Sequence, residues 1–406
     1  MNVLFLTLLD FENIEEHNIY TDLLREFYRN GHTICVVSPV ERRKHSKTRK
    51  IVINDRLSIV KTKIGNMQKT NVIEKGISTL TLESKVVGSI KKYYSDIKFD
   101  LVLYSTPPIT LQRAVEYVKK RDNAITYLML KDIFPQNAVD LGMLSTTGVK
   151  GFLYKYFRRK EKKLYQISDY IGCMSQANVD YVLKHNSEIE ESKVEICPNS
   201  IEVLDIDMSQ EEKEKMRKKY GIPLDKKVFV YGGNLGKPQG IDFMIECLKS
   251  QKSNSEAFFL IVGSGTEYGK IEKFINEEKQ KNIKLMKQMP KDDYDRMIAS
   301  CDVGMIFLDY RFTIPNFPSR LLSYMQAKLP ILAVTDVNTD VGKVIMDGGF
   351  GWWCESYYSI EFKKIIENIV LDKMLLDRGN KGWKFLLDQY SISICYVKVV
   401  KKCKEL

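Results

Sequence analysis

The regular alternation of short apolar segments with amphipathic segments limits the folds open to this chain of 406 residues more than any other feature. The apolar segments have the length of buried strands, and helical periodicity fills the intervals between them. They lie at residues 2–8, 33–38, 101–104, 125–130 and 170–174, and again at 228–231, 258–262, 283–286, 303–307 and 331–334. Such alternation predicts an α/β fold with parallel sheets that are covered by helices on both faces.

The alternation is interrupted once, by a polar and highly charged stretch at residues 202–219. The interruption predicts two doubly wound, Rossmann-like domains, 1–205 and 206–380, that face a central cleft. The last segment, 381–406, is predicted to form a helix that extends past the second domain and is able to cross back to the first. Ligands of such folds bind at the carboxyl ends of the strands, so the loops that follow the strands are the places to search.

Composition excludes several classes of protein. With 44% hydrophobic and 28% charged residues, the chain is globular rather than disordered or fibrous. Its eight cysteines form no C-x-x-C pair, which argues against a structural zinc site and indicates reduced, mostly buried thiols, as in a cytosolic protein. The opening MNVLFLTLL lacks a basic leader and resembles a first strand rather than a signal peptide, and no apolar run is long enough to span a bilayer.

The formal net charge of +11 indicates a polyanionic partner. Two basic stretches, 41–63 and 150–163, contain much of this charge, and the second (KGFLYKYFRRKEKK) places aromatic residues among the cations. Basic and aromatic residues together suit the interface of an anionic membrane, and the alternative for either stretch is a solvated basic helix. Nucleic acid is not expected, because the chain has no RNP-type, helix-turn-helix or P-loop motif.

Two glycine-containing loops follow strands of the second half. The first, 232–240, contains Gly233, Asn234 and Lys237, and the second, 263–267, contains Gly265. Glycine allows the backbone to approach a ligand closely, and a helix N-terminus after such a loop offers free N–H groups to phosphate. The alternative for each loop is a tight turn that needs glycine for its geometry alone.

A third segment, 315–325, has the features of a helix start. Its Asn316 is a capping residue type, Pro318 is tolerated in a first helical turn, and Ser319 and Arg320 follow. A helix dipole and a guanidinium both favour a diphosphate, so we expect this segment to bind one. The alternative is an ordinary capped helix with Arg320 on a solvated face.

The order of these motifs resembles a known family. The strings GGNLGKPQGIDFMIECL, VGSGTEYGKIEKF, MPKDDYDRMIASCDVGMIFL and FPSRLLSYMQAKLPILA resemble the donor domain of retaining GT-B glycosyltransferases of family 4, in the branch that builds bacterial capsule and O-antigen polysaccharides. In the first half, FDLVLYSTPPITL, LKDIFPQNAVDLGML and EICPNSIEV match that branch in kind and order. The resemblance implies that the second half binds a nucleotide sugar and that the first half binds the acceptor.

The chain departs from the family in the Glu-x(7)-Glu pair of the donor domain, which contacts the donor sugar and the ribose hydroxyls. Pro315 and Ser323 occupy the two positions, although Phe317 matches the aromatic residue between them. Asn234 and Gln239 replace the usual Arg and Lys of the glycine loop, so Arg320 and Lys237 are expected to supply the positive charge. The predicted donor site therefore consists of Gly233, Asn234, Lys237, Gly265, Phe317, Ser319, Arg320 and Ser323.

Candidate catalytic residues of the first half lie after strands. A general base for an acceptor hydroxyl requires a carboxylate or an imidazole, and Asp132, then His17 and Glu16, are the candidates, with Arg320 on the donor side. A solvated loop charge is the alternative for each, and the resemblance also implies a front-face transfer in which the leaving phosphate takes the acceptor proton. No metal site or cofactor is expected, because the D-x-D strings at 205–207 and 293–295 follow no strand of a nucleotide-binding first domain.

These observations together predict a metal-independent, retaining glycosyltransferase. Its donor is expected to be a UDP-linked, N-acetylated hexose and its acceptor a lipid-linked oligosaccharide, with the protein bound peripherally to the inner face of the cell membrane. The missing Glu pair keeps a second hypothesis open, a non-catalytic GT-B scaffold subunit of a polysaccharide assembly. A sugar-nucleotide epimerase of similar two-domain shape is a third, and a nicotinamide oxidoreductase rests only on the glycine loops.

Overall fold

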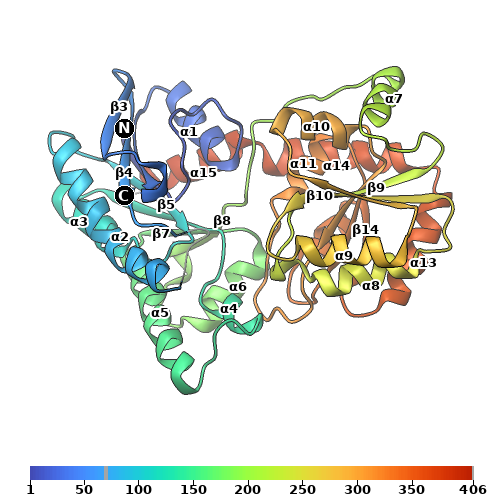
Figure 1. The fold of residues 1–406 in the computed structure, drawn as a ribbon. Coiled ribbons are helices and arrows are strands. Elements are labelled where there is room, and N and C mark those ends of the chain that lie inside the picture. The colour runs from blue at the N-terminus through green and yellow to red at the C-terminus, as the bar shows by residue number, and fades with distance from the viewer. Residues whose placement is uncertain (68–71, 405–406) are drawn as a thin grey trace. The chain divides into compact units, whose positions relative to one another are not determined.

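The computed structural model describes residues 1–67 and 72–404, which form two compact units. Unit 1 comprises Met1–Glu202 and Ile392–Leu406, and unit 2 comprises Val203–Ser391. Both ends of the chain therefore belong to unit 1 (Figure 1). The first division lies three residues before the predicted boundary at 205/206, and the second lies eleven residues after the predicted one at 380/381.

Unit 1 contains an eight-stranded sheet in the order β3-β4-β2-β1-β5-β6-β7-β8. All neighbouring strands are parallel except the β3–β4 pair at one edge. The strands are β1 Asn2–Leu6, β2 Thr33–Glu41, β3 Arg49–Asn54, β4 Leu57–Ile64, β5 Leu101–Thr106, β6 Ile125–Leu130, β7 Tyr170–Cys173 and β8 Val194–Ile196. The basic stretch 41–63 thus forms an antiparallel pair, and the helical alternative for it is wrong.

Helices cover both faces of this sheet, with α1 and α15 on one face and α2, α3 and α5 on the other (Figure 1). Asn18 sets the start of α1, because its side chain accepts hydrogen bonds from the backbone N–H groups of Tyr20 and Thr21. The helices are α1 Ile19–Arg29, α2 Val72–Tyr93, α3 Gln112–Asp122, α4 Gln136–Asp140, α5 Gly148–Ile167, α6 Gln176–His185 and α15 Ile392–Lys404.

The single helix predicted for 381–406 is two helices in the structure. The first, α14 (Leu375–Tyr390), belongs to unit 2, and Ser391 interrupts the helical path with an extended backbone conformation. The second, α15, packs against α1, where the Tyr396 hydroxyl and His32 Nε2 are 2.9 Å apart. The chain therefore returns to unit 1 at Ile392, whose N–H donates to the Ile201 carbonyl.

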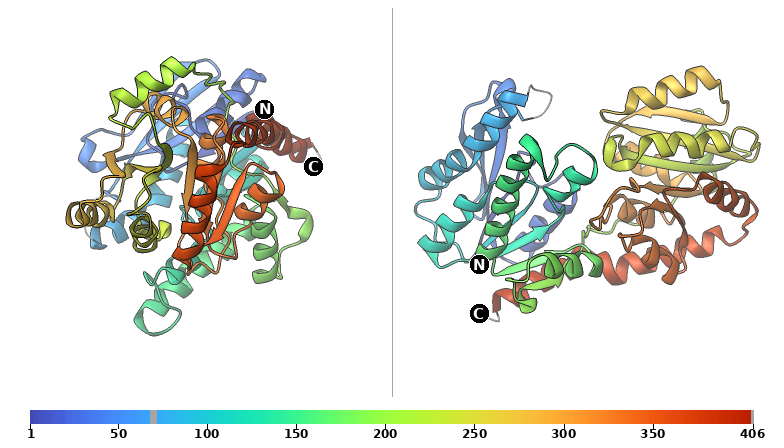
Figure 2. Two further views of the ribbon diagram at one scale, coloured as in Figure 1. Left: turned by 90° about the vertical axis from the view of Figure 1, so that its right-hand side faces the viewer. Right: turned by 90° about the horizontal axis from the view of Figure 1, so that it is seen from below.

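Unit 2 contains a six-stranded parallel sheet in the order β11-β10-β9-β12-β13-β14. Helices α8, α9 and α13 cover one face, and α10, α11 and α14 cover the other (Figures 1 and 2). The strands are β9 Lys227–Asn234, β10 Ala257–Ser264, β11 Ile283–Lys287, β12 Val303–Phe307, β13 Ile331–Thr335 and β14 Gly351–Glu355. The remaining helices are α7 Gln210–Lys219, α8 Ile241–Ser250, α9 Tyr268–Glu278, α10 Lys291–Ala299, α11 Arg320–Gln326, α12 Val341–Asp347 and α13 Ser359–Leu371.

The inner strands of unit 2 explain where its ligand site can form. Phe229, Phe259 and Met305 are fully buried between the helix layers, so the middle of the sheet is solid core. Because all six strands are parallel, their carboxyl ends and the loops that follow lie at one edge of the sheet. This edge is where backbone groups and polar side chains reach solvent.

Candidate functional site

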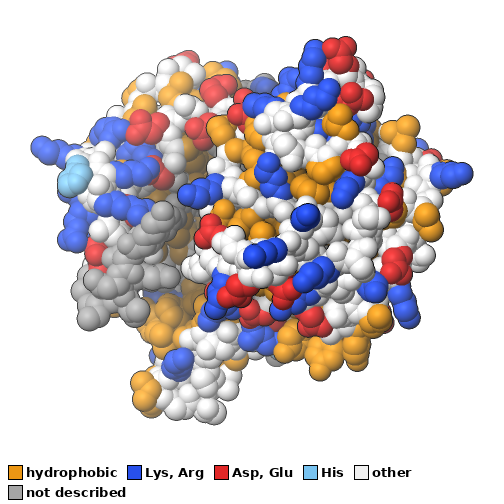
Figure 3. All heavy atoms as spheres, turned by 45° about the vertical axis from the view of Figure 1, so that its right-hand side comes forward, with side chains coloured by type: hydrophobic (Ala, Val, Ile, Leu, Met, Phe, Trp, Pro, Cys, Tyr) orange, Lys and Arg blue, Asp and Glu red, His pale blue; other side chains and the backbone are white. Residues whose placement is uncertain are grey.

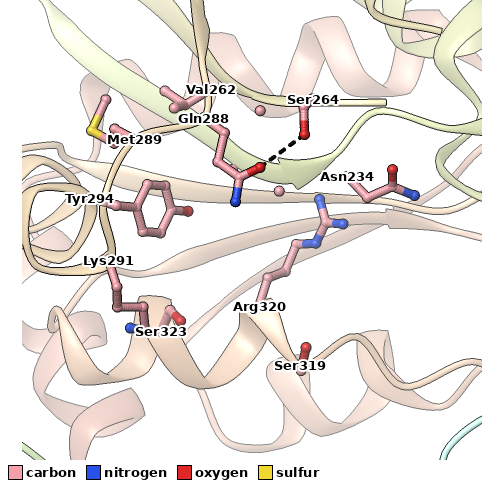
Figure 4. Close-up of a pocket in the computed structure, with 13 residues that line it drawn as sticks. Asn234, Val262, Ser264, Gln288, Met289, Lys291, Tyr294, Ser319, Arg320 and Ser323 are labelled. Atoms are coloured by element: carbon pink, nitrogen blue, oxygen red, sulfur yellow. Dashed lines mark hydrogen bonds between the residues drawn. The ribbon is translucent and has the colours of Figure 1, made fainter. Parts of the chain in front are cut away.

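A cavity of about 580 Å³ opens at the carboxyl edge of the unit 2 sheet (Figure 4). It lies where β9, β10 and β11 end and where α10 and α11 begin, so loops from five elements enclose it. Its wall is formed by Gly232, Gly233, Asn234, Val262, Gly263, Ser264, Gln288, Met289, Lys291, Tyr294, Ser319, Arg320 and Ser323. Ligand sites of doubly wound sheets occur at this edge, so the cavity is the candidate donor site.

Close packing of the two glycine loops requires glycine at specific positions. A Cβ atom on Gly263 would lie 1.9 Å from the Gly233 carbonyl oxygen, which is far inside contact distance. A Cβ atom on Gly232 would lie 1.7 Å from the Tyr294 hydroxyl. Gly233 itself has a φ of +124°, a conformation that other residues rarely adopt. The loops therefore expose backbone to the cavity at places where a side chain would close it.

Buried hydrogen bonds fix the first of these loops. The Gly232 N–H donates to the Tyr324 hydroxyl at 3.0 Å, and that hydroxyl donates to the Met305 carbonyl, also at 3.0 Å. Tyr324 belongs to α11, so the helix that begins at Arg320 is tied directly to the end of β9. Backbone that is held in this way is preorganised for a ligand and loses little freedom on binding.

Arg320 is the first residue of α11, and its guanidinium lies inside the cavity (Figure 4). The guanidinium carbon is 4.4 Å from the centre of the Tyr231 ring, a cation–π contact that holds the group in place. Its Nη1 atom is buried, and no atom of the described residues accepts a hydrogen bond from it. A buried cationic donor without an acceptor is costly. The site is therefore suited to an anion that would complete this hydrogen bond.

Three other polar side chains of the cavity already have partners. Ser264 donates to Gln288 Oε1 at 3.0 Å, which Figure 4 shows across the upper part of the cavity. Lys291 is paired with Asp295 one turn later on α10, at 2.7 Å. Asn234 Nδ2 donates to Gln239 at 3.1 Å. Arg320 therefore differs from these groups, because its charge has no carboxylate counterpart at the cavity within the described part of the chain.

The structure brings together five of the eight residues predicted for the donor site and leaves three outside the cavity wall. Gly233, Asn234, Ser319, Arg320 and Ser323 line the cavity. Lys237 lies on an exposed turn beyond it, Gly265 lies one residue past the lining segment, and Phe317 is buried against Tyr390 with ring centres 6.1 Å apart.

Sequence reasoning missed Gln288, Lys291 and Tyr294 as lining residues. They follow β11, and the available signal was their position directly after a strand of the same sheet. Tyr294 lies on α10, seven residues after the end of β11, so only the packing of α10 shows that its ring reaches Gly232. The D-x-D string at 293–295 lies on this helix, where Asp293 pairs with Lys219.

In unit 1, Asp132 lies in the loop between β6 and α4. Asn137 donates to its Oδ2 atom at 2.7 Å, and the Thr106 hydroxyl donates to its carbonyl oxygen at 3.0 Å. Burial raises the pKa of the Asp132 carboxyl to about 6, although hydrogen bonds from the Ile133 backbone and from Asn137 oppose this rise. A carboxyl with this pKa changes its protonation state close to neutral pH, as a general base must.

His17 and Glu16 lie in the loop after β1, which is separated from β6 by β5 in the sheet. His17 Nδ1 lies 2.8 Å from Arg25 Nη2 and 3.3 Å from Asp22 Oδ1. The Glu16 side chain is exposed, and only its backbone carbonyl takes part in this cluster, as an acceptor from Arg25 at 3.3 Å. His17 and Asp132 thus share the carboxyl edge of the sheet without being on neighbouring strands.

One group of possible metal ligands occurs in the described residues, formed by His17, Asp22 and Glu202. The Arg25 guanidinium already lies among these groups, because it pairs with Asp22 and donates to Glu202 at 3.1 Å. Burial is the largest influence on the pKa of Asp22 and raises it, against the attraction of Arg25. This cluster is organised as an ion-pair network around an arginine, whose guanidinium supplies the positive charge that these groups share.

Comparisons with known proteins show which proteins this chain resembles. Residues 212–382, which lie in unit 2, match the family model of glycosyl transferases group 1. Probable glycosyltransferase WbjE from Pseudomonas aeruginosa is 23% identical over 76% of this chain and 74% of its own. A putative teichuronic acid biosynthesis glycosyltransferase of Bacillus subtilis, TuaC, is 24% identical over 42% of this chain and 41% of its own.

Solved structures match the fold over the whole chain. Sucrose-phosphate synthase from Thermosynechococcus elongatus has a TM-score of 0.79 at 12% identity, with 100% of this chain and 98% of that chain covered. HepE of Anabaena in complex with UDP-glucose has a TM-score of 0.71 at 14% identity, with both chains covered completely.

In the described residues, none of the helices combines the length and the apolar character that crossing a membrane requires.

The sheets of 8 and 6 strands, the cavity beside Arg320 and these comparisons all indicate the same fold. The chain has the GT-B fold, and its residues 212–382 match the model of the group 1 glycosyltransferase family.

Proposed function

We propose that this protein transfers a sugar, with retention of configuration and without a metal ion, from a nucleotide-sugar donor to a lipid-linked oligosaccharide in capsule or O-antigen synthesis. The observation that supports this proposal best is the buried Nη1 atom of Arg320, which has no acceptor among the described residues and lies in the cavity of unit 2. A diphosphate has the charge and the acceptor oxygens that would satisfy it.

Each group of the cavity has a role in this proposal. Gly233 and Gly263 provide open backbone, and Arg320 at the start of α11 stabilises the charge that develops on the leaving phosphate. Ser319 and Ser323 offer hydroxyls on the same helix turn, and Ser323 stands where the family has the ribose-binding Glu. The donor is proposed to be UDP-linked and to hold an N-acetylated hexose.

The acceptor proton has two possible destinations in this scheme. In a front-face transfer the departing phosphate takes it, and the protein needs only to stabilise that phosphate. Asp132 is the alternative base in unit 1, because its pKa of about 6 allows it to be ionised and to accept a proton at neutral pH. Arg25 and Asp22 surround His17, so we rank His17 and Glu16 behind Asp132.

The relatives support the biosynthetic setting. WcaI of Escherichia coli, 23% identical over 51% of this chain and 49% of its own, is named as a putative colanic acid biosynthesis glycosyl transferase. TuaC is named for teichuronic acid biosynthesis. HepE was solved with UDP-glucose. By analogy we place this protein in the cytoplasm, at the inner face of the cell membrane, where it would meet a lipid-linked acceptor.

A thermal-shift panel of UDP-, GDP- and dTDP-sugars tests the donor part of the proposal. A ligand that binds only the folded state raises the melting temperature, and the stabilisation grows with the logarithm of one plus its concentration divided by its Kd. We expect UDP-sugars to raise it and the same panel to leave the Arg320→Ala variant unchanged. Failure of every nucleotide sugar to stabilise the wild-type protein would contradict the proposal.

The replacement of the family's Glu pair by Pro315 and Ser323 favours one competing function, a non-catalytic GT-B scaffold subunit. A scaffold would show no stabilisation by nucleotide sugars and no product. A sugar-nucleotide epimerase would convert its donor in the absence of any acceptor, whereas a transferase requires the acceptor. Product analysis with and without a lipid-linked acceptor separates these three activities.

A further inference from the structure

Helix α5 (Gly148–Ile167) presents apolar side chains to solvent at its N-terminal end. Val149 is 88% exposed, Phe152 78%, Leu153 46% and Tyr156 38%. Their spacing of three, four and seven residues from Val149 places all four on one side of the helix. An apolar stripe with this spacing is normally found against a protein core, and here, within the described structure, it faces water. We refer to these four residues as the α5 stripe.

Cations flank the α5 stripe. Lys150 follows its first residue on one flank, and Lys155 and Arg159 lie on the other flank, with Lys163 farther along the helix. All four are exposed, and none has a carboxylate within ion-pair distance among the residues that the structure describes. At the projecting start of α5, hydrophobic and basic side chains lie next to each other on the surface (Figure 3).

The remaining basic residues of this helix are used to hold it on unit 1. Arg158 donates to the Asn186 side chain at 2.7 Å, and Lys160 pairs with Glu83 and Lys162 with Glu188, both at 3.0 Å. On the inner side, Phe157 packs against Phe134. These contacts hold α5 on unit 1 at residues 157–162, so the stripe lies on a helix that is anchored just beyond it.

The other basic stretch, 41–63, differs in how its charges are paired. Its cations are largely paired within unit 1, as the pairs Arg42–Glu74, Lys44–Asp10 and Arg49–Glu12 show. Lys61 is fully buried and also pairs with Asp10. The structure therefore separates two stretches that look alike in the sequence: several cations of 41–63 pair with carboxylates of unit 1, whereas on α5 four exposed cations without an ion pair in the described residues flank a stripe of four apolar side chains.

We propose that the α5 stripe inserts into the interface of an anionic lipid bilayer while Lys150, Lys155, Arg159 and Lys163 contact the lipid phosphates. A helix that lies in the plane of the interface buries one apolar face and places basic residues at the headgroup level, which is the arrangement of α5. Basic residues near an anionic membrane each add attraction, so their unpaired state matters. The inference rests on the proposed function in one point: the lipid-linked acceptor is the reason why the protein would bind to the membrane.

Vesicle flotation with the full-length protein tests the inference. We expect the protein to float with vesicles in which about a third of the lipid is phosphatidylglycerol, and to remain in solution with pure phosphatidylcholine. The variant V149S/F152S, which changes two highly exposed side chains, is expected to bind at least about tenfold more weakly. The charge variant K155E/R159E is expected to lose binding by a similar factor.

Matched controls separate this surface from general effects. L371S/L376S removes two side chains on unit 2 that are 79% and 71% exposed, and K47E/K63E reverses two exposed cations of the other basic stretch. Both are expected to bind vesicles within about twofold of wild type. Equal losses in a control and in the α5 variants would overturn the inference, as would a wild-type protein that stays in solution with anionic vesicles.

A reporter placed on the stripe gives a direct readout. Phe152→Trp should shift its emission to the blue and be quenched by brominated lipid only when anionic vesicles are present. The inference would be overturned if the wild-type protein formed an oligomer in solution, did not bind vesicles, and became monomeric in the variant V149S/F152S. That result would assign the stripe to contact with a second copy of the chain. Stabilisation by UDP-sugars is independent of these readouts, so failure of donor binding and failure of membrane binding are distinguished.

Discussion

The carboxyl edges of the two sheets use charge in opposite ways. In unit 1 the charges after β1 neutralise one another, as Arg25 does with Asp22 and Glu202, and Lys61 does with Asp10. In unit 2 the guanidinium of Arg320 is held by an aromatic ring and faces a cavity, and its Nη1 atom has no acceptor in the described structure. The same type of edge therefore provides a closed ion-pair network in one unit and, in our proposal, an anion site in the other.

This contrast shows that the number of charges at a sheet edge is a poor guide to its ligand. What matters is whether a charge is already satisfied, because a buried group that lacks its partner gains most from a ligand that supplies one. In our proposal phosphate binds to unit 2, and the candidate base of unit 1 is Asp132, whose carboxyl is held by an amide rather than by a cation.

The largest effect is expected for Arg320→Ala. Removal of a preorganised donor to the leaving phosphate should lower kcat/KM about 10³-fold and abolish the thermal shift by UDP-sugars. Arg311→Ala is the matched control, because that arginine pairs with Asp309 at 2.7 Å and lies outside the cavity wall. If Arg320→Ala kept the thermal shift of the wild type, Arg320 would not be needed for donor binding, and the proposed difference between the two sheet edges would be contradicted.

Asp132→Asn tests the titratable group of unit 1. If Asp132 is the base, the change should lower kcat/KM about 10²-fold and remove the acidic limb of the pH–rate profile near pH 6. An unchanged profile would assign proton transfer to the departing phosphate. Glu16→Gln, which changes an exposed carboxylate of the same edge, is the control and should leave the profile as it is.

The same variant has a consequence for stability. Because folding raises the pKa of Asp132 from 3.8 to about 6, the folded state retains this proton at pH values where the unfolded chain has lost it. The contribution to the free energy of unfolding is full below about pH 4 and is lost by about pH 6, on the order of 2–3 kcal/mol. Urea unfolding at pH 4 and pH 7 should show this loss in the wild type and a smaller one in Asp132→Asn.

A third prediction concerns the backbone of the unit 2 edge. Gly263→Ala would place a Cβ atom 1.9 Å from the Gly233 carbonyl oxygen, so we expect the free energy of unfolding to fall by about 1–3 kcal/mol. Gly269→Ala, on α9, meets no described atom within 4 Å and should stabilise the protein by about 0.4–1 kcal/mol. Chemical denaturation of the pair measures both, and equal stabilities would show that the two glycine loops do not pack as described.

The smallest effects separate a lining residue from a neighbour that does not line the cavity. Ser323→Ala removes one hydroxyl from the cavity and should raise the Kd of the donor about 2–10-fold. Lys237→Ala changes an exposed lysine outside the wall and should alter the Kd by less than about twofold. Calorimetric titration with UDP is the measurement. A larger loss of affinity for Lys237→Ala than for Ser323→Ala would show that Lys237 belongs to the donor site.

The sequence was most informative where the signal is local. Apolar runs and the glycines after them predicted the strands and loops of unit 2. A helix was also predicted in segment 315–325, but α11 begins only at Arg320, with Ser319 rather than Asn316 at its N-cap and Pro318 before the first turn. The sequence was least informative where a side chain acts on a distant one. The Phe317 ring matches an aromatic position of the family, yet it packs on Tyr390, which is 73 residues later in the chain.

By itself, the amino-acid sequence determined the alternation of strands and helices, the two sheets and the glycines that keep the loops of one edge open. These properties depend on periodicity and on local backbone freedom, which are readable from neighbouring residues. Only the tertiary structure decided which cations are satisfied. Lys61 meets Asp10 and Arg25 meets Glu202 across long stretches of chain, while Arg320 and the lysines beside the α5 stripe meet no carboxylate in the described residues, because pairing is set by proximity in space.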